Sequence, residues 1–191
     1  MSPPIRGKAV HAMIGLGASA GLRISEVVRL DKSDVNLELG VLNVRNTKFG
    51  KSRMVPIHSS VVKVLMNYAR ARDETFKRLN SDSFFVNAEG RRFSKNRLQV
   101  IFSELACAVG LRGLTGRGPS FHCLRHSFAV KRLVEWYRSG INVQTMLPAL
   151  ATYMGHVHYT ESSYYLQGTP ELFDLATKTF HNLFVSKESV Q

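Results

Sequence analysis

The sequence predicts an α+β domain that is mainly α-helical and carries one small antiparallel sheet. Apolar residues recur at helical spacing over most of the 191 residues. Between residues 35 and 57 the pattern changes to short apolar runs separated by turn residues, which favours strands. The chain shows no internal repeat and no linker, and its length suits one domain with a single core.

The first part of the chain is apolar and rich in small residues. This pattern predicts a buried helix over residues 7–20 that ends near Gly21. A second helix is expected over residues 24–30.

The strand pattern follows this helix pair. Alternating apolar residues predict two short strands that turn at residues 38–40, and a third strand is expected over residues 54–57. A basic turn at residues 46–51 would connect the second strand to the third. Together these strands would form the small antiparallel sheet.

The remainder of the chain is expected to be mostly helical. Residues 84–86 predict a short strand, and Ser94 is a suitable cap for an amphipathic helix that continues to Val109. A glycine-rich loop follows at residues 110–119. Further helices are expected over residues 61–71, 121–137, 143–154 and 170–184.

Charge is the strongest signal in the composition. The 26 Lys and Arg residues exceed the 14 Asp and Glu residues, which gives a net charge of +12. A polyanionic partner is therefore expected. The positive residues lie in clusters along folded segments, which suits a groove that follows phosphates, and the alternative is a basic surface that is only solvated.

Membrane and metal chemistry are not expected. The chain has no run of eighteen apolar residues and no signal peptide, so we expect a cytoplasmic protein that does not contact a membrane. Cys107 and Cys123 have no partners at metal-ligand spacing and are expected to be buried thiols.

Two short segments place cations where they could hold a phosphate. In the sequence Gly-Leu-Arg-Ile-Ser-Glu, Arg23 and Glu26 are three residues apart at a helix start. An ordinary solvated ion pair is the alternative for this pair. In His-Cys-Leu-Arg-His, His122 and Arg125 share one helix face, a geometry that suits gripping a phosphate from one side.

A third segment contains a histidine and a tyrosine pair. His156 follows a glycine, and Tyr165 comes nine residues later, directly after Tyr164. Taken together, the three segments resemble the motifs of the tyrosine recombinase family, also called phage integrases. The resemblance extends over residues 16–184, and the three motifs occur in the family's order.

The resemblance implies roles for individual residues. The implied catalytic residues are Arg23, Lys48, His122, Arg125, His156 and Tyr165. Glu26 matches the acidic position that supports them, and Lys51 and Arg53 are expected to contact DNA phosphates. Tyr164 is the alternative nucleophile, and Lys51 is the alternative to Lys48.

The family activity implied is site-specific recombination. Such an enzyme breaks and rejoins DNA through a covalent 3′-phosphotyrosyl intermediate, with no metal, ATP or other cofactor. The expected partner is double-stranded DNA, bound by a homotetramer at the nucleoid of a prokaryotic or phage-infected cell. The alternatives are relaxation of DNA by a type IB topoisomerase, or DNA binding without catalysis.

The resemblance also bears on domain organisation. Relatives carry a DNA-clamping helical domain before the catalytic one, and here the first motif begins close to the start of the chain. We therefore expect residues 1–191 to be a catalytic domain and the clamping domain to lie outside this chain.

Overall fold

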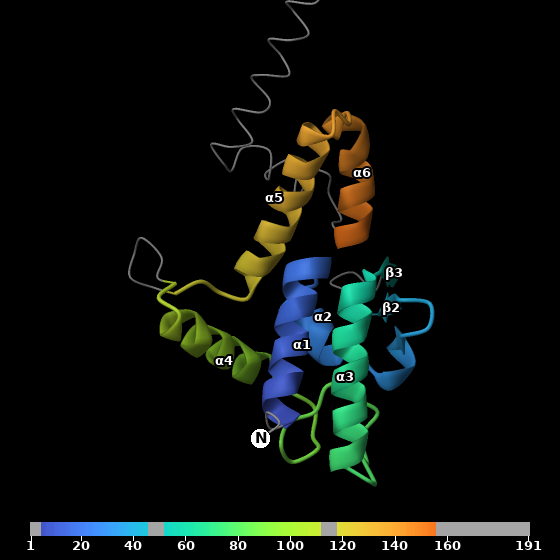
Figure 1. The fold of residues 1–191 in the computed structure, drawn as a ribbon, viewed down its shortest axis with the longest axis vertical. Coiled ribbons are helices and arrows are strands. Elements are labelled where there is room, and N and C mark those ends of the chain that lie inside the picture. The colour runs from blue at the N-terminus through green and yellow to red at the C-terminus, as the bar shows by residue number, and fades with distance from the viewer. Residues whose placement is uncertain (1–4, 46–51, 112–117, 156–191) are drawn as a thin grey trace, which may run out of the picture. The chain divides into compact units, whose positions relative to one another are not determined.

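The computed structural model describes residues 5–45, 52–111 and 118–155. In this part of the chain the expected fold class is confirmed, because the elements are mostly helices with one three-stranded antiparallel sheet (Figure 1). The chain forms two compact units, one up to Arg125 and one from His126 onward.

The first unit holds most of the secondary structure. It contains α1 (Ile5–Ala20), α2 (Ile24–Arg29), the 3₁₀ turn η1 (Lys32–Asp34), β1 (Val35–Asn36), β2 (Val41–Val44), β3 (Arg53–Pro56), α3 (Ser59–Thr75) and α4 (Lys95–Ala108). Helix α1 lies beside α3, as Figure 1 shows, and both helices bury apolar side chains. Ser94 caps α4 as the sequence indicates, because its hydroxyl accepts a hydrogen bond from the Arg97 amide.

The sheet has the strand order β1-β2-β3, and both pairings are antiparallel. Leu42 pairs with Val35 on one side and with Val55 on the other. Side chains alternate between the two faces of a strand, so Leu42, Val44 and Val55 all enter the core. Gly40 turns the chain between β1 and β2 with a positive φ of 63°.

The strand expected at residues 84–86 is wrong. These residues form no ladder, and Val86 makes only an isolated bridge with Arg92. The physical reason is that side chains of α3 form hydrogen bonds with backbone groups of this segment that would otherwise pair with a neighbouring strand. The Val86 amide donates to the Tyr68 hydroxyl at 2.9 Å, and the Phe84 carbonyl accepts from Arg72 at 2.9 Å.

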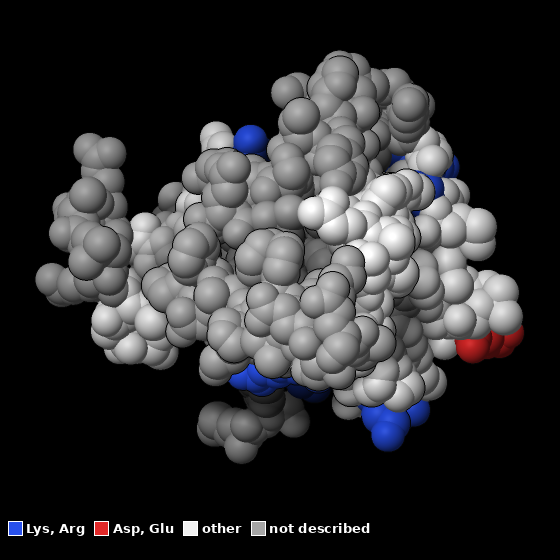
Figure 2. All heavy atoms as spheres, turned by 90° about the horizontal axis from the view of Figure 1, so that it is seen from above, with Lys and Arg blue, Asp and Glu red and all other residues white. Residues whose placement is uncertain are grey.

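The expectation of buried thiols is also wrong, because Cys107 and Cys123 are both exposed. Helix α4 buries a different face, which includes Ile101 and Phe102, and Cys107 lies outside it. Charged side chains also reach the surface, and Lys and Arg atoms form separate groups on the face drawn in Figure 2.

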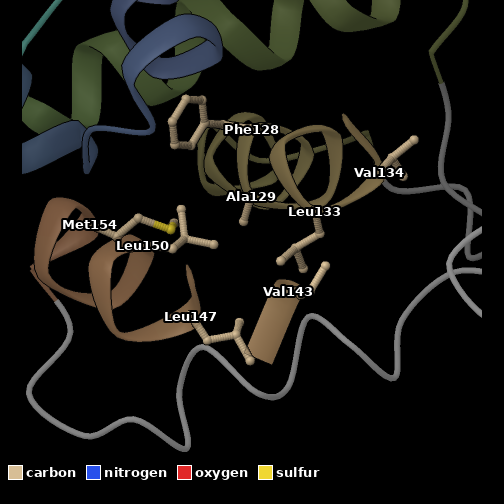
Figure 3. Packing of buried hydrophobic residues seen from close by; sticks show 8 residues of the cluster. All are labelled: Phe128, Ala129, Leu133, Val134, Val143, Leu147, Leu150 and Met154. Carbon is tan, nitrogen blue, oxygen red and sulfur yellow. The ribbon is translucent and has the colours of Figure 1, made fainter. Parts of the chain in front are cut away.

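The second unit is an antiparallel pair of helices. Helix α5 (His122–Arg138) enters this unit at His126, and α6 (Val143–Met154) follows after a short turn. The facing sides of the two helices form an apolar cluster, shown in Figure 3. Its buried members are Phe128, Ala129, Leu133, Val134, Val143, Leu147, Leu150 and Met154.

Helix α6 has a defined start and end. The Asn142 side chain accepts a hydrogen bond from the Gln144 amide at the start, and Gly155 ends the helix in the left-handed conformation. None of the helices in the described ranges is long and apolar enough to cross a membrane.

Candidate active site

The turn between α1 and α2 presents Arg23. Gly21 has a φ of 61°, which a residue with a side chain rarely adopts, and Leu22 is fully buried. Arg23 is the residue before the first turn of α2, and its carbonyl accepts the first helical hydrogen bond, from Val27. The turn is thus fixed on both sides, and the Arg23 side chain remains 24% exposed.

Glu26 holds Arg23 at two points. Its Oε2 accepts a hydrogen bond from the Arg23 backbone amide at 2.9 Å, which closes the start of α2. Its Oε1 lies 3.0 Å from Nη1 of the Arg23 side chain. The spacing in the sequence therefore corresponds to an ion pair that is partly buried rather than an ordinary surface pair.

Arg53 approaches the same carboxylate from β3. Its Nη1 and Nη2 donate to Oε1 and Oε2 of Glu26, each at 3.0 Å, in a two-pronged arrangement. Burial alone would raise the pKa of Glu26. The hydrogen bonds and charge of Arg53, followed by those of Arg23, outweigh burial and lower this pKa below its ordinary value. Glu26 is therefore an anion at neutral pH.

Arg125 joins this group from helix α5. Its side chain is almost completely buried, and its Nη1 donates to the Gly21 carbonyl at 2.6 Å. Gly21 lies two residues before Arg23, so the structure brings the first and second motifs together across a separation of 104 residues.

The start of α5 is fixed against α1 and α4. The Phe121 amide donates to Oε1 of Gln99 at 3.2 Å, and the Phe121 ring meets that of Phe102 edge-on. A Cβ atom at Gly17 would lie 2.8 Å from the Phe121 ring, so any side chain at this position would displace the ring. His122, the first residue of α5, is exposed one turn before Arg125.

A second group of charges lies beside the first. A cavity of about 480 Å³ is lined by Glu26, Arg29, Leu30, Asp31, Asp34, Asn43, Val44, Arg45 and Arg92. Here Arg45, at the end of β2, binds Asp31 at 3.1 Å and the buried Asp34 at 2.8 Å. Within the described residues, this group of charges stabilises the connection between α2 and the sheet.

The predicted site is only partly described. Four predicted site residues lie in the first unit: Arg23, Glu26, His122 and Arg125. Arg23 binds Glu26, and Arg125 binds the carbonyl of Gly21, two residues before Arg23. Arg53, a predicted DNA contact, lies in the first unit as well. The remaining predicted catalytic and DNA-contact residues lie outside the described residues: Lys48, Lys51, His156 and Tyr165. Tyr164 lies there too.

Sequence reasoning did not anticipate the partner of Arg53. The residue was expected to contact DNA, whereas its side chain is only 11% exposed and binds Glu26. A usable signal was the strand alternation, because Arg53 is two residues before the buried Val55 and faces the same side of β3. A cation that points inward needs a buried anion.

Comparison with known proteins gives one consistent result. A sequence model of the phage integrase family matches residues 4–171. A putative integrase/recombinase of Sinorhizobium fredii (y4rE) is 45% identical over 175 residues, which cover 92% of this chain and 56% of that protein. This chain thus spans about half the length of the curated relatives that it matches.

Solved structures agree on the fold. The crystal structure of XerA recombinase superposes with a TM-score of 0.74 at 23% identity, over 91% of this chain and 57% of that one. The XerH recombinase in a post-cleavage complex with a palindromic DNA substrate gives a TM-score of 0.70 at 20% identity, over 95% of this chain and 48% of that one.

Proposed function

This chain belongs to the phage integrase family, and from that membership we propose that it is the catalytic domain of a site-specific tyrosine recombinase. Its curated relatives are longer, and in this proposal the rest of the protein supplies a DNA-clamping domain. The relatives compared above are named as recombinases and integrases, which favours strand exchange over DNA relaxation or binding without catalysis.

The observation that carries the proposal is the hydrogen bond from Arg125 to Gly21. It places the guanidinium of the second motif beside the turn that presents Arg23. Guanidinium groups bind phosphate oxygens through paired hydrogen bonds and stay charged at any working pH. Two of them in one place can stabilise the negative charge that collects on the nonbridging oxygens in the transition state.

The proposed reaction is a transfer of the phosphoryl group to tyrosine. The Tyr165 hydroxyl loses its proton to His122 and attacks phosphorus, and the bond to the 5′-oxygen breaks. Lys48 gives a proton to this leaving oxygen, while His156 hydrogen-bonds the phosphate. The product is a 3′-phosphotyrosyl bond and a free 5′-hydroxyl, and attack by the hydroxyl of another strand reverses the step.

Neither a metal nor ATP enters this scheme. The arginines supply the positive charge that a metal supplies in many nucleases, and the covalent bond conserves the energy of the phosphodiester. Lys51 would bind a phosphate of the DNA backbone. For Arg53, the ion pair with Glu26 competes with that role.

The proposed assembly is a homotetramer on DNA. Exchange between two duplexes requires four broken strands, and each chain would contribute a single nucleophile. The palindromic substrate of the XerH complex supports an arrangement with two-fold symmetry at each site. Because the substrate is DNA, we place the protein at the nucleoid in the cytoplasm of a prokaryotic or phage-infected cell.

A nicked DNA substrate that loses a short fragment on cleavage tests the proposal. The chain should form a covalent protein–DNA adduct in the presence of EDTA. Tyr165→Phe should abolish the adduct and leave DNA affinity unchanged, because only the attacking oxygen is lost.

The matched variant is Tyr164→Phe, which should still form the adduct. Loss of the adduct in Tyr164→Phe alone would assign the nucleophile to Tyr164. Absence of any adduct in the unchanged chain, when the DNA is bound and matches the protein's own site, would overturn the catalytic proposal.

A further inference from the structure

We infer that Arg53 is a positioning residue that acts through Glu26 to hold Arg23 in place. The inference rests on the proposed function, in which Arg23 binds the phosphate that is cut. It assigns Arg53 to the interior of the site instead of to the DNA contacts expected from the sequence.

The three side chains form a layered arrangement. Glu26 lies in the middle with its side chain 5% exposed, Arg53 on one side is 11% exposed, and Arg23 on the other is 24% exposed. The most exposed cation is thus the one that the proposal places on the phosphate. Arg53 is held further inside, on a strand of the sheet.

The hydrogen bonds explain how Arg53 could orient Arg23. Arg53 binds both oxygens of Glu26 at 3.0 Å and so fixes the plane of the carboxylate. The same two oxygens bind the Arg23 backbone amide and Arg23 Nη1. A rotation of the carboxylate would therefore break contacts to the turn and to the side chain of Arg23 together.

The balance of charge leads to the same conclusion. Two guanidiniums around one carboxylate leave a net positive charge, so Glu26 can hold Arg23 without cancelling its attraction for phosphate. Without Arg53, Arg23 would be the cation among the described residues that still binds Glu26 directly, and burial would raise the pKa of Glu26. Other charged groups also line the cavity at Glu26: Arg29, Asp31, Asp34, Arg45 and Arg92.

The first test measures adduct formation by the full chain at several pH values. In Arg53→Met, single-turnover cleavage should slow by about ten- to a hundredfold, which does not exceed the lower end of the cost of losing one transition-state donor, about 10²–10³. The defect should deepen as the pH falls, because loss of Arg53 raises the pKa of Glu26 and a protonated Glu26 no longer forms an ion pair with Arg23. Arg53→Lys should recover only part of the rate, since an ammonium cannot form the two-pronged bond.

A double substitution separates this role from a general structural one. If Arg53 acts through Glu26, then Arg53→Met combined with Glu26→Gln should cleave no more slowly than the slower single variant. Multiplied defects would overturn the inference.

Arg45→Met is the matched control. Arg45 also binds carboxylates beside the sheet, but within the described residues its ion pairs are with Asp31 and Asp34, so the cleavage rate of Arg45→Met should show no added dependence on pH. An equal defect in Arg45→Met would mean that the loss of any nearby cation is enough, and would contradict the inference.

DNA affinity distinguishes the two roles of Arg53. A phosphate contact predicts weaker binding in Arg53→Met, with a salt slope lower by about one, and restoration by Arg53→Lys. Our inference predicts an unchanged salt slope in both variants. A lowered slope that lysine restores would return Arg53 to the DNA contacts.

A readout without DNA keeps this test separate from the proposed function. In the free chain, NMR titration of the Glu26 carboxyl carbon should show a higher pKa in Arg53→Met, and the Arg23 guanidinium signal should change with it. If the unchanged chain forms no adduct, the proposed function fails, and the inference is judged by this titration. An Arg23 signal that is unaffected in Arg53→Met would overturn it.

Discussion

In the proposed function, the position of Arg125 prepares it for phosphate before DNA arrives. Its side chain is almost completely buried, and one of its five N–H groups is committed to the Gly21 carbonyl. A guanidinium fixed in this way loses little conformational freedom when it binds a phosphate, which is the condition for strong electrostatic catalysis. Arg23 is fixed at the same turn by Glu26, so both arginines are oriented by contacts inside the protein.

The catalytic role proposed for Lys48 rests on its position in the sequence, because Lys48 lies between β2 and β3 outside the described residues. Its ammonium would protonate the 5′-oxygen as the bond breaks. Replacing that oxygen by sulfur gives a leaving group with a pKa near ~8.5, so protonation no longer limits the step. Lys48→Ala should therefore cleave ordinary DNA very slowly and the 5′-phosphorothiolate at nearly the normal rate.

Arg125→Ala is the control for this experiment. It should stay defective on both substrates, because Arg125 is proposed to act on the nonbridging oxygens, which the sulfur does not replace. Rescue by sulfur in Lys51→Ala but not in Lys48→Ala would identify Lys51 as the acid. Rescue of neither variant would assign protonation elsewhere, with His122 the next candidate.

At the scale of secondary structure, contacts within elements were predictable and contacts between them were not. Helical periodicity and the cap at Ser94 correctly gave α4, and strand alternation gave the sheet. Residues 84–86 have strand propensity, but Tyr68 and Arg72 on α3 occupy their backbone groups. Such pairings depend on which elements meet in space, which a local pattern does not contain.

In the candidate site too, the contact within one element was predictable from the sequence and the contacts between elements were not. Arg23 and Glu26 are three residues apart on one helix start, so their contact followed from helical geometry. The contact of Arg125 with Gly21 spans 104 residues, and only the family resemblance connected those two motifs. The contact of Arg53 with Glu26 was not predicted, because a basic residue beside a basic turn has the same composition whether it faces DNA or a buried carboxylate.

The contact between Tyr68 and Val86 provides a test of how α3 supports this segment. Tyr68 is 1% exposed, and its hydroxyl accepts from the Val86 amide at 2.9 Å. Tyr68→Phe should leave a buried amide without this partner and lower the free energy of unfolding by about 1–3 kcal/mol. Urea denaturation at neutral pH measures the loss.

The comparison variant is Tyr137→Phe, which changes a tyrosine that is only partly buried beside the apolar cluster of α5 and α6. Its effect should be smaller, within about 0.5 kcal/mol. Equal losses in the two variants would show that the hydroxyl of Tyr68 contributes nothing particular to residues 84–86.

At the scale of the whole molecule, the 26 Lys and Arg residues that give the net charge of +12 have two kinds of partner. Some bind carboxylates within the protein, and others are proposed to bind DNA phosphates. Several arginines of the described residues are bound to carboxylates within the protein: Arg23, Arg45, Arg53, Arg72, Arg92 and Arg132. These ion pairs use negative charges that are already in the minority. In the proposed function, Arg23 binds phosphate while it is held by Glu26, and most of the other DNA contacts come from cations outside this list.

The affinity for DNA should consequently fall steeply with salt. Binding to DNA releases one set of counterions for each phosphate that a cation neutralises, so the logarithm of the affinity falls linearly with the logarithm of the salt concentration. A chain that contacts about 6–10 phosphates should lose about 10³–10⁵ in affinity between 50 and 200 mM salt. Fluorescence anisotropy with a labelled duplex measures this slope, and an affinity insensitive to salt would contradict a DNA-binding role.

Two single substitutions test which cations contribute to the slope. Lys51→Gln should reduce it by about one, because Lys51 is proposed to bind a phosphate. Arg72→Gln should leave it unchanged, because Arg72 is buried, bound to Asp73 and to the Phe84 carbonyl, and has its guanidinium carbon 5.2 Å from the centre of the Phe84 ring. The two variants lose the same formal charge, so a difference between their slopes can arise only from where the charge lies. If both reduced the slope equally, the net charge of the chain and not its placement would govern DNA affinity, and the assignment of Lys51 as a phosphate contact would fail.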